Sequence, residues 1–337
     1  MNIAVIGAGS WGTALGIHAA RANHTVALWT RDGVLAATIN RERRHTRLSA
    51  AYELPRALTA TNDFNIALRD ATLIVLALPS HATRETWRNL VKCLTHPVIV
   101  VSATKGIETT SGKRISEIIA DESSETVAGF VALSGPSFAE EVAANQPTAI
   151  VAASHDAAAR DAVQQALSHG NFRVYTNDDL VGVELGGAAK NTLALAAGMC
   201  AGLGLGSNSV AALITRGLAE MTRLALAYGA KPETLTGLAG LGDLVLTCTG
   251  RLSRNRHVGE ELGRGRALDD ILGSLKETAE GVRTTLAVRE LAARRRIEMP
   301  ITEQVYRVLY EAAPVADAIG ELMGRPLTTE FGVRQGV

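Results

Sequence analysis

The 337-residue sequence contains only three cysteines, which are widely spaced and form no CxxC pair: Cys93, Cys200 and Cys248. This pattern excludes a disulfide framework, so we expect small buried side chains in a reducing, cytoplasmic compartment. Its 34 basic and 34 acidic residues give a formal net charge of zero, which argues against the overall basic field typical of nucleic-acid binding. The eight histidines show no HxxxH or HxH spacing, and we therefore predict no metal site.

A basic leader is also missing, because an apolar run at residues 3–6 follows the first two residues directly. We therefore expect no signal peptide. Residues 191–215 carry no charge and are long enough to span a bilayer. However, they include serines, asparagines and the glycine-rich run Gly202–Gly206. This composition favours two buried helices joined by a glycine turn, without membrane insertion.

Strand-like and helical segments alternate in the first half of the chain, which predicts a parallel sheet covered on both faces. The strand-like runs are Ile3–Ile6, Thr25–Trp29, Leu73–Leu78, Val98–Val101, Phe130–Leu133, Thr148–Ala152 and Phe172–Tyr175. From Val181 onward the pattern is helical, with glycine and proline between segments. We therefore expect an α/β domain over residues 1–180, followed by an all-α domain over residues 181–337.

The first strand leads into Gly7-Ala8-Gly9-Ser10-Trp11-Gly12, a GxGxxG motif that opens a helix. In a Rossmann-like dinucleotide-binding unit, Gly7 permits the tight turn, Gly9 lets the backbone approach a pyrophosphate, and Gly12 lets helix and strand pack closely. The helix N-terminus offers free N–H groups to the phosphates. The motif is common as a plain turn, but its position between a strand and a helix favours dinucleotide binding.

The second strand ends at Trp29-Thr30-Arg31-Asp32, where a carboxylate would favour NAD(H) and an arginine would accept the 2′-phosphate of NADP(H). Arg31 is either such a phosphate ligand or a solvated surface residue, and the sequence leaves both open. We predict that NADPH is used at least as well as NADH.

Polar loops follow the later strands, at the edge of the sheet where ligands of open α/β folds bind. They are Pro79-Ser80-His81, Ala103-Thr104-Lys105-Gly106 and Ser134-Gly135-Pro136-Ser137-Phe138. Lys105 is placed to meet an anionic substrate or to polarise a carbonyl, although a surface lysine is the alternative. His81 is a weaker candidate for a general base than for a loop hydrogen-bonding residue.

Lys190 follows glycines and alanines that make a thin helix face, and an apolar segment comes after it. Desolvation there would lower its pKa toward the range of a general base, while the alternative is a lysine that extends to solvent from a core helix. We expect Asp243 to lie in a buried loop over residues 240–249. Ser253 is a predicted helix N-cap, and Arg254 and Asn255 in the first turn are suited to a phosphate. The basic runs 41–47 and 294–296 are interpreted as solvated faces.

Ten stretches in order along the chain resemble the bacterial type of NAD(P)-dependent glycerol-3-phosphate dehydrogenase. They are GAGSWGTAL, LALPSH, ATKGIE, SGPSFAEEV, ELGGAAKN, ITRGLAEM, LAGLGDLVLTCT, SRNR, AEGVRTT and MPITEQVY. Together they span nearly the whole chain, and the combination is far more specific than any single motif. One departure is the pair Glu140-Glu141, where the family pattern allows a lysine.

The resemblance implies a role for each matching residue. It makes Lys190 the proton acceptor, assisted by Lys105 and Asp243. It implies a substrate site formed by Lys105, Gly135, Ser137, Lys190, Asp243, Ser253, Arg254 and Asn255. It implies a cofactor site formed by Gly7, Gly9, Ser10, Trp11, Gly12, Arg31, Lys105, Ala139, Arg254 and Glu280.

The implied reaction is reversible oxidation of sn-glycerol 3-phosphate to dihydroxyacetone phosphate with NAD(H) or NADP(H), which supplies glycerol 3-phosphate for phospholipid synthesis. The implied partner is a small phosphorylated molecule rather than nucleic acid, and a homodimer is compatible with the resemblance. A β-hydroxyacid or ketopantoate dehydrogenase of the same domain plan is the main alternative. A DNA-binding NAD(H) sensor is disfavoured, since no basic reading helix is evident.

Overall fold

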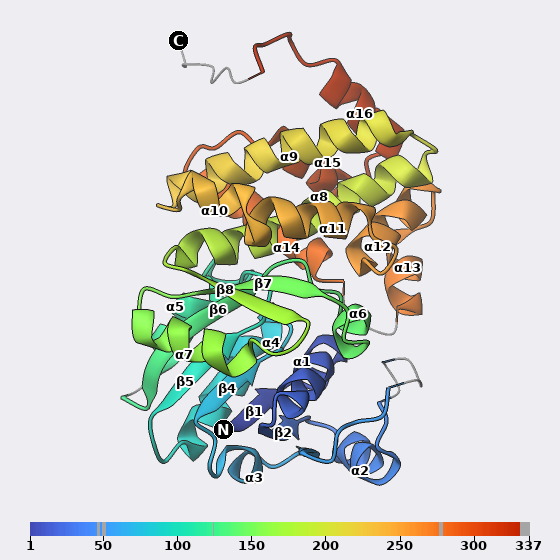
Figure 1. The fold of residues 1–337 in the computed structure, drawn as a ribbon. Helices are drawn as coiled ribbons and strands as arrows, with labels where there is room; N and C mark the ends of the chain where they lie inside the picture. Colours follow the sequence, from blue (N-terminus) through green and yellow to red (C-terminus); the bar gives the residue numbers. More distant parts are fainter. Residues whose placement is uncertain (46–47, 49–51, 124, 276–278, 331–337) are drawn as a thin grey trace.

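The protein is described from a computed structural model covering residues 1–45, 48, 52–123, 125–275 and 279–330. A sheet with flanking helices forms one half of the molecule, and a group of helices forms the other (Figure 1). The helices of the second half lie over the edge where the parallel strands end. This arrangement brings residues from both halves to one place.

The described residues form one eight-stranded sheet with the order β3-β2-β1-β4-β5-β6-β7-β8. Its strands are β1 (Asn2–Ile6), β2 (Thr25–Trp29), β3 (Leu58–Thr61), β4 (Leu73–Leu76), β5 (Val98–Ser102), β6 (Val127–Ser134), β7 (Thr148–Ala153) and β8 (Phe172–Asn177). The order reverses direction between β1 and β4, and at such a switch point the loops after the strands diverge and leave room for a ligand. The edge strand β3 was not predicted, because its four residues carry little apolar signal.

The expectation of a wholly parallel sheet was wrong for one pair, because β6 and β7 are antiparallel. The connection between them contains only the short helix α6 (Ala139–Ala143). A parallel return requires a crossover that carries the chain back along the sheet. Here α6 instead packs against α1 (Ser10–Arg21) beyond the carboxyl edge, so the chain re-enters the sheet from the edge at which it left.

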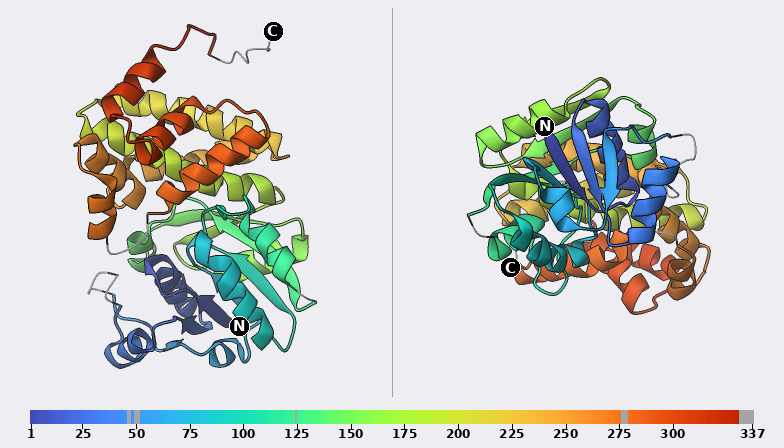
Figure 2. Two further views of the ribbon diagram at one scale, coloured as in Figure 1. Left: turned by 180° about the vertical axis from the view of Figure 1, so that it is seen from behind. Right: turned by 90° about the horizontal axis from the view of Figure 1, so that it is seen from below.

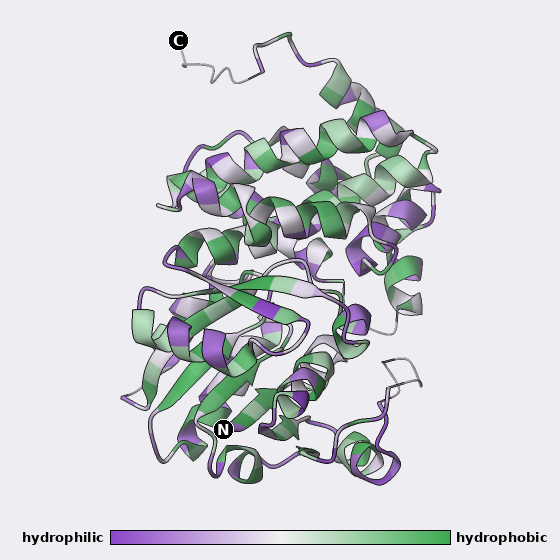
Figure 3. Cartoon of the chain, viewed as in Figure 1, coloured by the Kyte–Doolittle hydropathy of each residue, from purple (hydrophilic) through white to green (hydrophobic). Residues whose placement is uncertain are grey.

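Helices cover both faces of the sheet, as the alternating pattern predicted. In Figure 1 α1 and α7 lie on the near face, and the view from behind in Figure 2 shows α4 and α5 on the other. Their bounds and those of the short elements are α2 (Gly33–Glu42), α3 (Phe64–Leu68), α4 (Ser80–Leu90), η1 (Val91–Cys93), α5 (Ile115–Glu122) and α7 (Ala157–Leu167). The central strands are correspondingly apolar, as the colouring of Figure 3 shows.

The second half is built around α8 (Leu180–Gly202), which is buried along nearly its whole length. Glycines let α12 cross it closely, because a Cβ on Gly198 would lie 2.0 Å from the Arg256 carbonyl oxygen. The remaining elements are α9 (Ser207–Ala227), α10 (Pro232–Thr236), the π-helical turn η2 (Leu238–Gly242), α11 (Asp243–Thr249), α12 (Arg254–Gly263), α13 (Leu268–Ser274), α14 (Glu280–Arg294), α15 (Pro300–Tyr310) and α16 (Val315–Met323). The Rossmann-like and all-α fold class is confirmed, while the domain boundary at residue 180 stays a prediction.

The uncharged stretch 191–215 forms the end of α8 and the start of α9, joined by a turn in which Gly204 has a φ of +75°. The expectation that both helices are buried was wrong for the second one. Its first turns are largely exposed, because small and polar side chains such as Ala211 and Thr215 face outward while Leu213 and Ile214 pack against the core. No helix in the described part of the chain is long and apolar enough to cross a membrane.

Candidate active site

The glycine loop has the geometry that the motif predicts. Gly7 adopts a φ of +115°, and a Cβ on Gly12 would lie 2.0 Å from the Gly7 carbonyl oxygen. By contrast, a Cβ on Gly9 would meet no described atom within 4 Å. Packing within the protein therefore explains two of the glycines, and the third leaves open space beside the N-terminus of α1. That helix has no side-chain cap in the described structure, and the partial positive charge of its N-terminus favours an anion.

The tip of β2 separates the roles of two neighbouring charged residues. Asp32 is the N-cap of α2, because its Oδ1 accepts hydrogen bonds from the N–H groups of Val34 at 2.9 Å and Leu35 at 3.1 Å. This cap commits the carboxylate to the helix. Arg31 remains exposed beside it. The arrangement supports a role for Arg31 in phosphate binding more than one for Asp32 in ribose binding.

The basic run 41–47 was only partly interpreted correctly as a solvated face. Arg41 is exposed, but Arg43 donates to the carbonyl oxygens of Leu54 and Leu58 at 3.1 and 2.9 Å. His45 is buried, with its Nε2 2.9 Å from the Ala8 carbonyl oxygen in the glycine loop. The carbonyl groups of a connecting segment need donors, and these two side chains turn inward to supply them. Thr46 and Arg47 lie outside the described residues.

Lys190, Asp243 and Lys105 meet where the two halves of the molecule join. Lys190 Nζ donates to Asp243 Oδ1 at 2.5 Å, and Lys105 Nζ donates to Asp243 Oδ2 at 2.6 Å. Thr247 Oγ1 accepts a further hydrogen bond from Lys190 Nζ at 2.8 Å. Asp243 is 1% exposed and Lys190 is 5% exposed. One buried carboxylate therefore holds two ammonium groups from different parts of the chain.

The buried position changes the proton affinity of these groups. Burial lowers the pKa of Lys190 to about 8; the charge of Asp243 opposes this shift and that of Lys105 adds to it. Burial alone would raise the pKa of Asp243, but the charges of Lys105 and Lys190 outweigh it and lower that pKa below its usual value. A lysine with a pKa near 8 can exchange a proton at physiological pH.

The thin helix face predicted before Lys190 is present in α8. A Cβ on Gly187 would lie 2.8 Å from Ser134 Oγ at the end of β6 and 3.8 Å from Lys105 Cγ, so glycine lets the end of β6 approach the helix closely. Lys190 lies one turn further along the same helix. The glycine thus places the helix against the end of the sheet, and Lys190 reaches the space between them.

Asp243 does not lie in a loop, as the sequence suggested, but in the first turn of α11. The glycines before it form the π-helical turn η2, in which a Cβ on Gly240 would lie 2.1 Å from the Leu235 carbonyl oxygen. Glycine is typical of loops, and the sequence does not distinguish such a loop from a wide helical turn. The helix explains a residue that the sequence analysis missed: Thr247 follows Asp243 by four positions and therefore shares its face.

A second group of predicted residues lies beside this cluster. Ser253 caps α12 by accepting a hydrogen bond from the Arg256 N–H at 3.2 Å, as predicted, and Arg254 is exposed next to it. The Asn255 side chain donates to Asn191 Oδ1 at 2.9 Å and accepts from the Gly281 N–H at 2.9 Å. Asn191 in turn reaches the Lys105 carbonyl oxygen at 3.4 Å. Asn191 was not among the predicted site residues, although it follows Lys190 directly.

The loop after β6 supplies an acceptor to the cluster. Gly135 has a φ of +134°, and its carbonyl oxygen accepts from Lys105 Nζ at 2.9 Å and from Ser137 Oγ at 2.9 Å. A Cβ at this position would lie 2.9 Å from the backbone of Ile150. Ala139 begins α6 and lies half-buried against the same core as Trp11. The predicted residues of this loop therefore do lie together at the carboxyl edge of the sheet.

Two residues predicted for the cofactor site, Trp11 and Glu280, carry buried polar atoms without a hydrogen-bond partner in the described structure. Glu280 Oε2 accepts from Ser80 Oγ at 2.8 Å, whereas Glu280 Oε1 is buried without a hydrogen-bond partner in the described structure. The same holds for the Nε1 atom of Trp11. Burial lowers the pKa of His81, and the charge of Arg283 adds to this shift. The charge of Glu280 raises that pKa, whereas the charge of Arg31 lowers it. A buried polar group without a partner is costly, so these atoms fit a bound polar ligand.

Cys200 and Cys248 are buried as predicted, but Cys93 is only half-buried because it ends the short helical turn after α4. No group of three or more His, Cys, Asp or Glu residues within the described ranges could hold a metal ion.

Comparison with known proteins assigns the family. The profile of the NAD-dependent glycerol-3-phosphate dehydrogenase N-terminus matches residues 2–160, and that of the C-terminus matches residues 179–320. The chain belongs to this family. It is 50% identical over 332 residues to glycerol-3-phosphate dehydrogenase [NAD(P)+] of Koribacter versatilis, covering 98% of each chain.

The crystal structure of glycerol-3-phosphate dehydrogenase from Coxiella burnetii aligns with a TM-score of 0.92 and 42% identity, covering 96% of this chain and 99% of that one. A ketopantoate reductase from Ralstonia eutropha aligns with a TM-score of only 0.61 and 16% identity, covering 95% and 100%. This second likeness shows a shared fold alone. The family assignment therefore favours the glycerol-3-phosphate dehydrogenase reading over the ketopantoate-type alternative.

Proposed function

We propose that this protein catalyses the reversible oxidation of sn-glycerol 3-phosphate to dihydroxyacetone phosphate with NAD(H) or NADP(H). Its curated relatives carry the name glycerol-3-phosphate dehydrogenase [NAD(P)+]. The observation that carries the proposal is the buried Lys190–Asp243–Lys105 cluster at the carboxyl edge of a dinucleotide-binding sheet. The proposal includes a physiological role in supplying glycerol 3-phosphate for phospholipid synthesis.

The protein residues would handle the proton and the orientation of the substrate. Neutral Lys190 takes the proton of the 2-hydroxyl group during oxidation and returns it during reduction. Asp243 fixes the Lys190 amine and balances its charge, while the Lys105 ammonium stabilises negative charge that develops on the substrate oxygen. A bound nicotinamide supplies the hydride acceptor or donor. The glycine loop and the N-terminus of α1 would hold the pyrophosphate of that cofactor, and Trp11 and Glu280 would hold further polar groups of it.

The N-terminus of α12 would hold the substrate phosphate. Ser253 and Asn255 are buried there, and the exposed Arg254 adds a positive charge. An arginine in the first turn is unfavourable for the helix dipole unless an anion lies nearby. Because Asn255 already binds Asn191 and Gly281, its amide is fixed in orientation before any substrate arrives. Such preorganisation would fix the reacting carbon relative to Lys190.

The decisive test measures NADH and NADPH oxidation side by side with dihydroxyacetone phosphate and with ketopantoate. We expect turnover with dihydroxyacetone phosphate only, and NADPH used at least as well as NADH. Preferred turnover of ketopantoate would contradict the proposal. The Lys190→Ala variant should lose at least about 10²-fold in kcat, because general acid–base catalysis contributes about 10²–10⁴-fold. Its cofactor affinity, measured by fluorescence titration, should stay unchanged.

A further inference from the structure

Lys105 lies in a segment that forms neither helix nor strand over the described residues 103–114, between the end of β5 and the start of α5. Side chains on such loops keep a fixed position only when specific contacts offset the loop's conformational entropy. Lys105 must nevertheless place its ammonium 2.6 Å from Asp243 on the opposite half of the molecule. The contacts that hold this loop therefore bear on the chemistry of the cluster.

The loop is attached on both sides. Thr104 Oγ1 donates to the Leu78 carbonyl oxygen at 2.9 Å, which ties the loop to the sheet half. Ile107 is 1% exposed and packs in the core of the helical half. On the same side Arg294 of α14 donates to the Ser111 carbonyl oxygen at 3.1 Å. These contacts fix the path of the loop but not its charged residue Glu108, which follows Lys105 by three positions.

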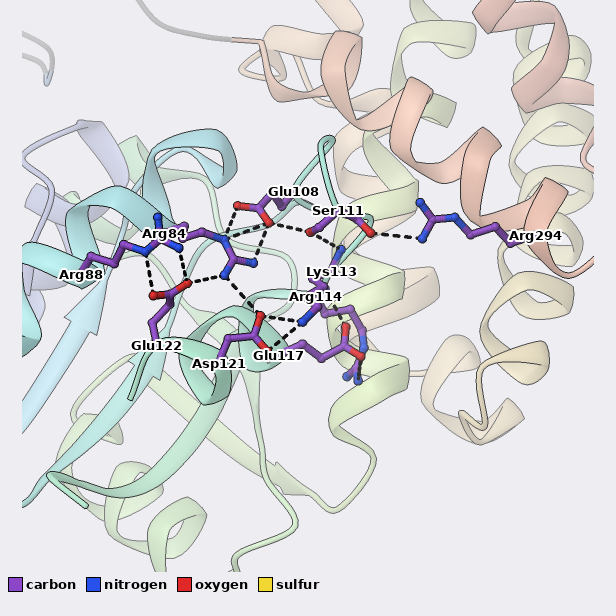
Figure 4. Close-up of polar contacts among 10 residues, drawn as sticks. All are labelled: Arg84, Arg88, Glu108, Ser111, Lys113, Arg114, Glu117, Asp121, Glu122 and Arg294. Carbon is purple, nitrogen blue, oxygen red and sulfur yellow. Dashed lines mark hydrogen bonds and ion pairs between the residues drawn. The ribbon is translucent and has the colours of Figure 1, made fainter. Parts of the chain in front are cut away.

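Glu108 is held by a two-pronged ion pair with Arg84 of α4, shown in Figure 4. Arg84 Nε lies 2.9 Å from Glu108 Oε1, and Arg84 Nη2 lies 2.8 Å from Glu108 Oε2. Ser111 Oγ donates to the same carboxylate at 2.6 Å and closes the turn of the loop. The Glu108 side chain is 9% exposed, so this carboxylate has little water to replace the arginine.

Arg84 is itself fixed from its other side. Its Nη1 donates to Glu122 Oε1 at 2.5 Å and to Asp121 Oδ2 at 3.2 Å, both on α5. The planar guanidinium thus joins α4, α5 and the Lys105 loop, which a lysine could not do with the same geometry. Arg88, one turn further along α4, also pairs with Glu122 at 2.7 Å and carries no contact to Glu108 in the described structure.

We infer that Arg84 and Glu108 are positioning residues that hold Lys105 against Asp243 and so adjust the acid–base behaviour of Lys190. The inference rests on the proposed function for its catalytic consequence. When the ion pair is broken, the buried Glu108 carboxylate moves toward water and carries the adjoining loop with it. Lys105 then withdraws from the cluster. Asp243 lies on α11 and keeps its hydrogen bond with Lys190.

The direction of the effect follows from the groups that face Lys190. They are Asp243 and Cys248 on α11 and Lys105 on the loop, and the positive charge of Lys105 lowers the pKa of Lys190. Withdrawal of that charge leaves Asp243 unopposed, and the pKa of Lys190 rises above about 8. Oxidation requires neutral Lys190, so the acid limb of its pH profile moves to higher pH.

The experiment compares Arg84→Met with Arg88→Met, which removes a neighbouring arginine of the same helix and serves as the matched control. Both are assayed for oxidation of glycerol 3-phosphate from pH 6 to 10, and thermal unfolding is recorded for each. We expect Arg84→Met to lower kcat/KM by about tenfold or more, since small misplacements of reacting groups are costly. We also expect its acid-limb midpoint to rise by about one pH unit, as one nearby charge commonly shifts a pKa by this much. Arg88→Met should keep the wild-type values of both.

Equal midpoints for the two variants would overturn the inference, even if Arg84→Met unfolds at a lower temperature, because a purely structural role changes stability without moving the midpoint. If Arg84→Met does not fold, Glu108→Gln decides by the same criteria, since it keeps the shape of the side chain. Labelling of Lys190 with acetic anhydride across the same pH range, followed by mass spectrometry, reports its pKa without turnover. A wild-type protein that reduces no dihydroxyacetone phosphate would contradict the proposed function, whereas an unchanged labelling midpoint in Arg84→Met would contradict the inference alone.

Discussion

The Asp243→Asn substitution tests whether one buried carboxylate sets the proton affinity of Lys190. Asp243 attracts two ammonium groups at 2.5 and 2.6 Å, and asparagine keeps its shape without its charge. Two unit charges about 4 Å apart interact by about 4 kcal/mol at an effective dielectric constant of about 20. Since one unit of pKa corresponds to about 1.4 kcal/mol, the pKa of Lys190 should fall by about two to three from its value near 8.

The two directions of the reaction should respond in opposite ways. Oxidation needs neutral Lys190, so its acid limb should move from about pH 8 toward about pH 5 to 6. Reduction needs the protonated amine, and at pH 7 a variant with a pKa near 5 holds only about one part in a hundred of that form. Reduction of dihydroxyacetone phosphate at pH 7 should therefore lose up to about a hundredfold, in addition to any loss of orientation.

The assay is stopped-flow measurement of both directions from pH 5 to 10, which separates hydride transfer from product release. Thr247→Val is the matched control, because it removes a neutral hydrogen-bond partner of Lys190 without changing a charge. Its midpoint should move by less than about one pH unit, in keeping with the modest net energy of one neutral hydrogen bond. An acid limb that stays in place or moves upward in Asp243→Asn would refute the assignment of Lys190 as the titrating base.

Three further results are expected from residues outside this cluster. Arg31→Ala should raise KM for NADPH about tenfold or more and leave KM for NADH unchanged, because only NADPH carries the 2′-phosphate that Arg31 would bind. Asp32 is committed to its helix cap. An equal loss for both cofactors would contradict this assignment. Gly9→Ala should weaken cofactor binding in a titration without lowering Tm, whereas Gly12→Ala should destabilise the fold, since its Cβ would clash with backbone at 2.0 Å. Burial raises the pKa of Glu220 from 4.5 to about 7, so between these two pH values the folded state retains a proton that the unfolded state has lost. The free energy of unfolding should therefore fall by up to about 3 kcal/mol as the pH rises from about 4.5 to about 7. Glu220→Gln should flatten that part of the Tm–pH curve, and an unchanged slope would show that another group is responsible.

Local patterns were sufficient for the parts of the protein whose structure is decided locally. The apolar runs became strands, the glycine motif became a turn into α1, and Ser253 became a helix cap. The small residues before Lys190 also indicated its burial, with a lysine that extends to solvent as the alternative, and the side chain is buried. For the strands, the glycine turn and the helix cap, the deciding pattern lies within a few positions along the chain.

Features that depend on contacts distant in sequence were not predictable from one chain. The antiparallel pair β6–β7 follows from where α6 packs, and the sequence does not show that. Arg84 and Glu108 are separated by 24 positions, and nothing in either neighbourhood indicates that they pair.

The cluster is best understood as a balance between two lysines that compete for one carboxylate. Removing the charge of Asp243 should lower the pKa of Lys190, and withdrawing Lys105 should raise it, so the two perturbations are expected to move the same midpoint in opposite directions. Asp243 and Lys190 lie on packed helices, whereas Lys105 lies on a loop. The adjustable member of the balance is therefore Lys105. In an Asp243→Asn background, no carboxylate offsets the repulsion between the two lysines, and this repulsion lowers the pKa of Lys190. The Arg84→Met substitution withdraws Lys105 and should therefore still raise the midpoint. A double variant whose midpoint equals that of Asp243→Asn alone would show that Arg84 acts on Lys190 by some other route.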